Sequence, residues 1–403
     1  MKELNISKIE PYLAWLFVFC YFLELLSFPD TWVLIGGSAI CAVLYARQKI
    51  LRVDMLICLL TLTVVLYFGL DKNWGIAMIT PITYVFPITF LLAHYLAAEV
   101  KMNGGGNEGI IKVLLAMILG LTIHGILNSY MWLDGQWRDG SFRIWKDFWC
   151  DDYKYAAWQN SYYLPAMAMF LPALMYKKNR SVIINIFIML SAVFFLYISV
   201  VSESRVTALM FPILICMQIV LYMLLERKQF AEKLNMKHVA IAGCVVCVVL
   251  ILAGIIFVNS SMGQRFLNIM SRDGGIFNNI RFKFQRQALG ELFVYPFGGR
   301  KMEFMGYGHA HNAWIDIADA AGVIPFFAFV IYTFISVFEL VKLLRASYVS
   351  TELKLIVFGI YIAFVMFFTI ESALESYGRY IAPWIFLQGL IHGYISREKT
   401  LVG

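Results

Sequence analysis

Residues 182–225 read VIINIFIMLSAVFFLYISVV, then SESR, then VTALMFPILICMQIVLYMLL. Two long apolar runs without a charged residue thus enclose four polar residues. A helix needs about 20 predominantly apolar residues to cross a bilayer. The stretch therefore predicts two membrane spans, 182–202 and 206–225, joined by a tight polar turn.

The rest of the chain has the same character. Its 403 residues are 61% hydrophobic and 15% charged, whereas soluble domains average about 45–50% and about 25%. This composition excludes a soluble enzyme and is typical of an integral membrane protein. The net charge of +7 does not indicate nucleic-acid binding, because an excess of Lys and Arg is normal in the cytoplasmic loops of membrane proteins.

We expect an all-α polytopic fold, with a single membrane domain over residues 1–403 and about twelve spans. The predicted spans are 12–28, 32–46, 53–70, 75–98, 110–133, 161–176, 182–202, 206–225, 238–258, 320–341, 355–372 and 380–395. With the N-terminus inside, the cytoplasmic connections hold 19 of the 33 basic residues, and the short outer connections hold only Lys72, Arg205 and Arg379. This bias predicts that both termini are cytoplasmic. The long connections 134–160 and 259–312 then face outward.

The stretch 308–314, GHAHNAW, places two histidines at the outer mouth of a span. An imidazole has an unperturbed pKa near 6.5, so His309 or His311 can serve as a general base. Two other interpretations are open. The rings can lie in the headgroup layer, or His309, His311 and Asp316 can bind a metal ion.

The turn Ser202-Glu203-Ser204-Arg205 carries the second candidate. An Arg at the end of an apolar run is costly in lipid and usually pairs or faces a polar cavity. Arg205 either pairs with Glu203, snorkels to the surface, or binds an anionic ligand.

The outer connection 259–312 carries positive charge on the side where it is normally scarce. Its seven basic residues against three acidic ones give a net charge of +4 and indicate an anionic partner. The basic residues are Arg265, Arg272, Arg281, Lys283, Arg286, Arg300 and Lys301, and the acidic ones are Asp273, Glu291 and Glu303. A solvated or headgroup-binding face is the alternative for Lys283, Lys301, Arg265 and Arg272.

A short amphipathic helix is expected within this connection. Its apolar positions are Phe282, Leu289, Leu292 and Phe293, Asn278-Asn279 would cap it, and Pro296 with Gly298-Gly299 would end it. Arg281 lies in the first turn. A guanidinium beside the free N–H groups of a helix start makes a phosphate site.

The connection 134–160 is rich in aromatic residues interleaved with charges. Trp and Tyr at a membrane face commonly form an interfacial belt. The alternative is a sugar platform, because aromatic faces stack on pyranose rings while carboxylates accept from hydroxyls. Arg138 and Arg143 are candidate contacts for an anionic substrate, as is Arg286 in the second connection.

Three carboxylates lie near outer span ends: Asp316, Glu371 and Glu375. They are candidates for positioning an acceptor hydroxyl or for pairing with Arg379. Glu375 and Arg379 are four residues apart, so a local ion pair is the simpler interpretation for them.

Taken together, the chain resembles the O-antigen ligase and O-antigen polymerase superfamily. The resemblance rests on S-x-S-R ending at Arg205, N-x-R-x-x-x-x-x-x-A around Arg281 followed by Pro296-Phe297-Gly298-Gly299, and H-x-H-N at residues 309–312 followed by Gly322-Val323-Ile324-Pro325. The order and spacing of these elements and the number of spans match the family over nearly the whole chain.

The resemblance implies a glycosyltransferase of the bacterial inner membrane whose active site is periplasmic. Its donor would be a glycan on undecaprenyl diphosphate, used without nucleotide sugar, metal or other cofactor. Arg205 and Arg281 would bind the diphosphate. His311 would take the acceptor proton during direct, inverting attack while His309 orients it, or the two would exchange roles; Asn312 would fix the loop.

The acceptor separates two members of the family. A ligase transfers the glycan to a sugar hydroxyl of lipid A–core, and a polymerase joins it to a second lipid-linked repeat unit. H-x-H-N and S-x-S-R favour the ligase, whereas the 28-residue separation of Arg281 and His309 is compatible with a polymerase. A transporter of the same lipid-linked glycan is a third hypothesis, disfavoured because mid-span charge is sparse, with Glu24 the main exception.

Overall fold

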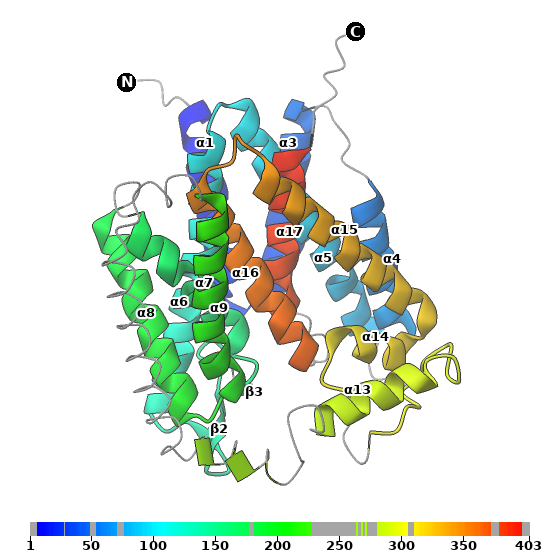
Figure 1. The fold of residues 1–403 in the computed structure, drawn as a ribbon. Coiled ribbons are helices and arrows are strands. Elements are labelled where there is room, and N and C mark those ends of the chain that lie inside the picture. The colour runs from blue at the N-terminus through cyan, green and yellow to red at the C-terminus, as the bar shows by residue number, and fades with distance from the viewer. Residues whose placement is uncertain are drawn as a thin grey trace.

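The computed structural model describes residues 6–27, 29–48, 54–70, 76–150, 152–176, 181–226, 263–264, 267–268, 271, 280–304, 310–371 and 379–396. The chain folds mainly into helices, as the composition predicts (Figure 1). Six stretches within the described residues are long and apolar enough to cross a membrane, as expected for a multi-pass membrane protein. They are Val85–Met102 in α5 (Ile76–Met102), α6 (Gly106–Leu133), α8 (Val182–Val201), Val206–Leu225 in α9 (Arg205–Leu225), α15 (Val323–Arg345) and α16 (Thr351–Ile370).

Shorter apolar helices occupy several other predicted spans. They are α1 (Ile6–Phe22), α3 (Ser38–Gln48), α4 (Met55–Leu70), α7 (Asn160–Met175) and α17 (Ala382–Ile395). The predicted span 238–258 lies outside the described residues. The number of twelve spans stays a prediction.

Two predicted spans are interrupted. Span 12–28 ends at Phe22 and continues as the 3-10 turn η1 (Leu25–Ser27), where Leu26 has φ 59°. Span 32–46 consists of α2 (Pro29–Trp32), the π-helical segment η2 (Val33–Gly37) and α3. Both breaks depend on local backbone geometry, which cannot be predicted from the length of an apolar run.

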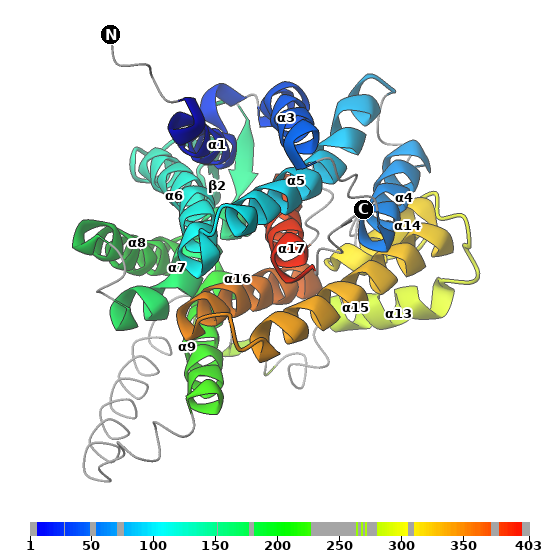
Figure 2. The same ribbon diagram turned by 90° about the horizontal axis from the view of Figure 1, so that it is seen from above.

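Helix α17 lies inside the bundle and packs closely on α5 (Figure 2). Every residue from Ala382 to Ile391 is buried. A Cβ at Gly389 would lie 2.2 Å from the Phe90 carbonyl oxygen, and one at Gly393 would lie 2.4 Å from the His94 carbonyl oxygen. Small residues at this spacing let the two backbones approach, which is how helices associate in lipid.

The connection 134–160 is a small antiparallel sheet rather than an irregular loop. Its strands are β1 (Trp137–Arg138), β2 (Ser141–Lys146) and β3 (Tyr153–Tyr155), in the order β1-β2-β3. Trp145 of β2 pairs with Lys154 of β3 and is fully buried. The aromatic residues of this connection are thus divided between a packed core and an exposed surface.

A buried polar network attaches the sheet to the helices. The Asp147 carboxylate lies 3.3 Å from His124 Nε2 and accepts from Asn128 Nδ2 at 3.2 Å and from the Trp149 N–H at 3.0 Å. Burial alone would raise the pKa of Asp147. The hydrogen bond to His124 and the nearby positive charges outweigh this effect, so the pKa lies well below its usual value. Asp147 therefore remains a carboxylate although it is buried.

The predicted amphipathic helix is present as α13 (Ile280–Glu291), with Arg281 in its first turn. Its packed face differs from the predicted one, because Phe284, Ala288 and Leu292 are buried while Leu289 and Phe293 are exposed. The three buried residues follow one another at intervals of four, so they lie on one face of the helix. The expected capping residues Asn278 and Asn279 lie outside the described residues.

The span predicted at 320–341 begins with two helices, because α14 (Ala313–Ala321) and α15 are separated at Gly322, where φ is 91°. Helix α13 and the β-sheet lie at one end of the bundle; α1 begins and α17 ends at the opposite end (Figure 1). The described parts of the two long connections therefore lie at the same end of the bundle.

Candidate functional site

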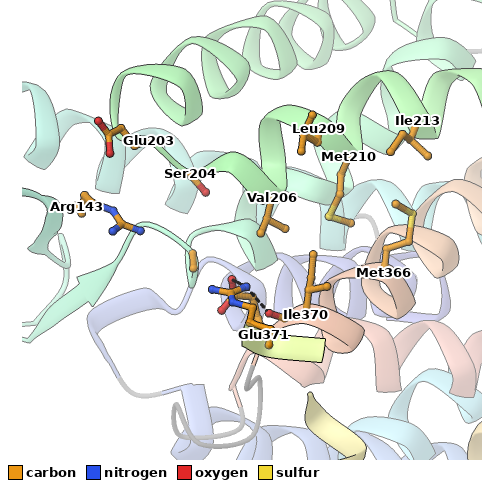
Figure 3. Close-up of a pocket in the computed structure, with 12 residues that line it drawn as sticks. Arg143, Glu203, Ser204, Val206, Leu209, Met210, Ile213, Met366, Ile370 and Glu371 are labelled. Atoms are coloured by element: carbon orange, nitrogen blue, oxygen red, sulfur yellow. Dashed lines mark hydrogen bonds and ion pairs between the residues drawn. The ribbon is translucent and has the colours of Figure 1, made fainter. Parts of the chain in front are cut away.

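A cavity of about 320 Å³ opens at the end of the bundle that holds the sheet and α13. It lies between the first turns of α9 and the last turns of α16, with β2 and α13 at its edge (Figure 3). Its lining has a polar part, formed by Arg143, Glu203, Ser204, Arg281 and Glu371, and an apolar part, formed by Ala157, Val206, Leu209, Met210, Ile213, Met366 and Ile370.

Arg281 is held against the end of α16. Its Nη1 donates to the Ile370 carbonyl oxygen at 2.7 Å and to Glu371 Oε1 at 3.0 Å. A guanidinium here satisfies a carbonyl that a helix end leaves without a partner and meets the negative end of the helix dipole. The side chain remains 33% exposed and lines the cavity.

Glu371 is shared between two predicted site residues. Oε1 accepts from Arg281, and Oε2 lies 3.6 Å from His311 Nδ1. Burial raises the pKa of Glu371, but the interactions of its carboxylate with His311 and Arg281 outweigh the effect of burial, so this pKa lies below its usual value. The structure thus contains an ionised, buried carboxylate between a guanidinium and an imidazole.

The backbone around His311 is fixed on both sides. Asp316 accepts the N–H of Ala310 at 2.8 Å and that of Asn312 at 3.3 Å. The Asn312 side chain caps α14 by accepting from the N–H groups of Trp314 and Ile315. Asp316 thus binds backbone N–H groups through both of its carboxylate oxygens, and these hydrogen bonds hold the loop around His311 in place.

His311 itself has φ 55°, in the left-handed region that side chains other than Gly rarely adopt. Glu203, which lines the cavity, has the same φ of 55°. Residues held in such conformations cluster at active sites and ligand clamps, where the surrounding structure enforces them. Glu203 is in the cavity lining, whereas His311 lies behind it, 3.6 Å from the lining residue Glu371.

Gln285 joins α13 to the other two elements. Its Nε2 donates to the Thr369 carbonyl oxygen at 3.0 Å and to the His311 carbonyl oxygen at 3.5 Å. Asn312 Nδ2 donates to the same Thr369 oxygen at 3.3 Å. The start of α13, the entry to α14 and the end of α16 therefore form one hydrogen-bonded unit that carries Arg281, His311 and Glu371.

The serine-rich turn before α9 forms another side of the cavity. Arg205 is the first residue of α9, and its side chain lies outside the described part of the chain. Ser204 is buried, with its hydroxyl 3.2 Å from Thr207 Oγ1. Glu203 and Ser204 both line the cavity, so the turn reaches the same space as Arg281.

The other predicted contacts are separated by the fold. Arg143 of β2 lines the cavity. Arg138 is 60% exposed and pairs with Asp139 at 3.6 Å, and Arg286 is exposed on α13; neither lines the cavity. His309 and Glu375 lie outside the described residues, as does the Arg379 side chain.

The alternative interpretation as a metal site finds no support in the described ranges. No group of three or more His, Cys, Asp or Glu side chains there could hold a metal ion. His309, one of the three ligands considered, lies outside those ranges.

The position of Glu371 between Arg281 and His311 was not predicted from the sequence. The predicted partner of this carboxylate was an acceptor hydroxyl or Arg379. The available signal was a lone acid directly after the twenty-residue apolar helix α16, where a carboxylate needs a cationic partner. Nor was it predicted that the apolar residues Leu209, Met210 and Ile213, on α9, line the site.

Comparison with known proteins adds no relative. No protein-family model matches the chain, and no curated protein matches it. The resemblance to the O-antigen ligase and polymerase superfamily therefore stays an expectation from the motifs.

Proposed function

We propose that this chain is a glycosyltransferase of the bacterial inner membrane that takes a glycan from undecaprenyl diphosphate and passes it to an acceptor hydroxyl on the periplasmic side. The observation that carries the proposal is the two-part cavity. Arg281 and Arg143 lie at its polar part, and apolar side chains of α9 and α16 continue from it. A polyprenyl diphosphate has the same division into an anionic head and an apolar chain.

The electrostatics fit a diphosphate leaving group. When the bond from the anomeric carbon to the diphosphate oxygen breaks, its electron pair goes to that oxygen and negative charge accumulates there. Cationic groups placed beforehand around the oxygen stabilise this charge in the transition state. Arg281 and Arg143 supply guanidinium groups, whose paired N–H groups match phosphate oxygens.

The acceptor half of the reaction needs a base. The acceptor oxygen attacks the anomeric carbon from the face opposite the diphosphate, and its proton moves to the imidazole of His311. The product is a glycoside of inverted configuration, and the protonated imidazole later releases its proton to water. Glu371 lies at the Nδ1 atom of this ring, which leaves Nε2 for the acceptor proton.

For the acceptor we propose the sugar hydroxyl of lipid A–core, as in an O-antigen ligase, on the strength of the H-x-H-N and S-x-S-R motifs. Joining of two lipid-linked repeat units, as in a polymerase, is the competing proposal. Both use the same donor chemistry.

The test is a transfer assay with purified protein in proteoliposomes that contain undecaprenyl-diphosphate-linked glycan. One set receives lipid A–core, and another receives only further lipid-linked units. Transfer of glycan to lipid A–core supports the ligase; chain growth on undecaprenyl diphosphate in the second set supports the polymerase. Movement of the glycan lipid across the bilayer without a new glycosidic bond contradicts the transferase proposal.

A further inference from the structure

Glu371 presents a different oxygen to each of two proposed reacting groups. Oε1 accepts from Arg281 Nη1 at 3.0 Å, and Oε2 lies 3.6 Å from His311 Nδ1. The carboxylate is 5% exposed, so water does not weaken either interaction strongly. One side chain therefore links the cation that faces the cavity to the proposed base.

The contact with Arg281 determines how a side chain at position 371 is oriented. Arg281 donates its Nη1 both to Glu371 and to the Ile370 carbonyl oxygen, so the guanidinium is anchored at the end of α16. A guanidinium has only donors. Whatever group stands at position 371 must therefore turn an acceptor toward Arg281.

The contact with His311 determines which ring nitrogen carries the proton. An ionised carboxylate has only acceptors, so it favours the tautomer with a proton on Nδ1, which leaves the lone pair on Nε2. At 3.6 Å the pair is longer than a hydrogen bond. Such contacts are often long before substrate binds and shorten in the reactive complex.

The backbone of His311 is fixed, which holds its Cα in place relative to Glu371. Asp316 and Asn312 hold the residues on either side, and Gln285 reaches the His311 carbonyl oxygen. In the described part of the chain, the Glu371 carboxylate after α16 lies against this ring, and the same carboxylate pairs with Arg281 on α13. Glu371 is the acceptor between them.

We propose that Glu371 is a positioning residue, which keeps the Nε2 of His311 unprotonated for the acceptor hydroxyl and holds Arg281 at the cavity. This inference rests on the proposed glycosyl transfer and adds a residue to it. In the reaction, the proton leaves the acceptor oxygen for Nε2, and the imidazolium that forms keeps its Nδ1 proton directed at Glu371. The carboxylate stabilises that cation without taking the proton.

The Glu371→Gln variant tests this sharply, because its amide has one acceptor and one donor end. Arg281 requires the acceptor, so the amide NH₂ is turned toward His311 Nδ1. That donor selects the opposite tautomer, with the proton on Nε2, and the base is lost. The corresponding carboxylate-to-amide change in Ser-His-Asp triads costs about 10⁴-fold in kcat through the wrong tautomer, and we expect a loss of about 10³-fold here.

The experiment compares the wild type with Glu371→Gln, Glu371→Asp and the control Glu303→Gln, which removes an exposed carboxylate from the connection that carries Arg281 and His311. Transfer rates are measured in the proteoliposome assay. Protein labelled with ¹⁵N-histidine is examined by NMR at a pH above 8, where a free imidazole is neutral, and the His311 signals are assigned by their loss in His311→Asn.

We expect the Nδ1–H tautomer of His311 in the wild type and in Glu303→Gln, and the Nε2–H tautomer in Glu371→Gln. Glu371→Asp keeps the charge and should recover at least about one tenth of the wild-type kcat. An unchanged tautomer in Glu371→Gln overturns the inference, as does a rate loss that Glu371→Asp does not relieve. Absence of transfer by the wild type overturns the proposed function instead, and the tautomer measurement still reports on Glu371.

Discussion

Gly322 lies directly against Pro296: a Cβ at Gly322 would stand 2.2 Å from the Pro296 carbonyl oxygen, which also accepts the Val323 N–H at 3.0 Å. The segment after α13 is thereby docked onto the junction of α14 and α15. The same docking includes Gly298, whose own Cβ would lie 2.6 Å from the backbone nitrogen of Ala321. Two stretches that the sequence motifs single out, 296–299 and 322–325, are thus two sides of one contact.

Gly322→Ala is expected to destabilise the protein. The new Cβ meets backbone atoms that cannot rotate away, and φ is 91°, so we expect a loss of about 2–4 kcal/mol. The measurement is thermal unfolding of the detergent-solubilised protein. Gly290→Ala is the matched control, because nothing lies within 4 Å of its Cβ position in helix α13; a stability of Gly322→Ala equal to that of this control would contradict the docking.

Arg281→Ala should reduce glycan transfer by about 10²- to 10³-fold, the usual cost of losing one group that stabilises developing negative charge. Arg281→Lys should recover only part of the rate, because a single ammonium cannot reproduce the geometry of the guanidinium. Lys283→Ala, on the exposed face of the same helix, is the control and should retain the wild-type rate. Equal rates for Arg281→Ala and Lys283→Ala would remove Arg281 from the site.

The stability of the β-sheet should fall in acid through the protonation of Asp147. Its pKa is lower in the folded protein than its ordinary value of 3.8, so its contribution is present in full above pH 3.8 and disappears as the pH falls toward the lower folded value. Asp147→Asn, which loses the charge while keeping the shape, should be less stable than the wild type at pH 7 by about 1–3 kcal/mol. This difference should shrink below pH 3.8 in unfolding curves recorded across pH; a constant difference would show that the charge is not responsible.

Chelation should leave transfer unchanged, since the proposed displacement uses arginine groups and an imidazole. The proteoliposome assay is run with and without EDTA. A loss of rate that added Zn²⁺ restores would revive the metal interpretation of His309, His311 and Asp316.

Topology can be tested at two exposed positions on opposite ends of the bundle. In a cysteine-free background, Lys283→Cys on α13 should react with a membrane-impermeant maleimide applied from the periplasm. Arg345→Cys, at the end of α15, should react only after the membrane is opened. The reverse labelling pattern would invert the orientation inferred from the distribution of basic residues.

The sequence by itself determined that the chain is a helical membrane protein and where many of its helices lie. Apolar length does this because a bilayer demands an uninterrupted apolar segment with internally paired backbone groups. Thus the runs 182–202 and 206–225 correspond to α8 and α9 within a residue at each end. The start of α13 near Arg281 was also predictable, because helix signals are local.

Only the tertiary structure decided which polar groups meet. Arg281 and Glu371 are 90 residues apart, and Arg143 and Ser204 approach the same cavity from a sheet and a helix start. Spacing along the chain could suggest Glu375 with Arg379 but could not select Glu371 for Arg281. The physical reason is that burying a charge without a partner is costly. Arg281 therefore pairs with the carboxylate at the helix end that the packing of the bundle brings beside it.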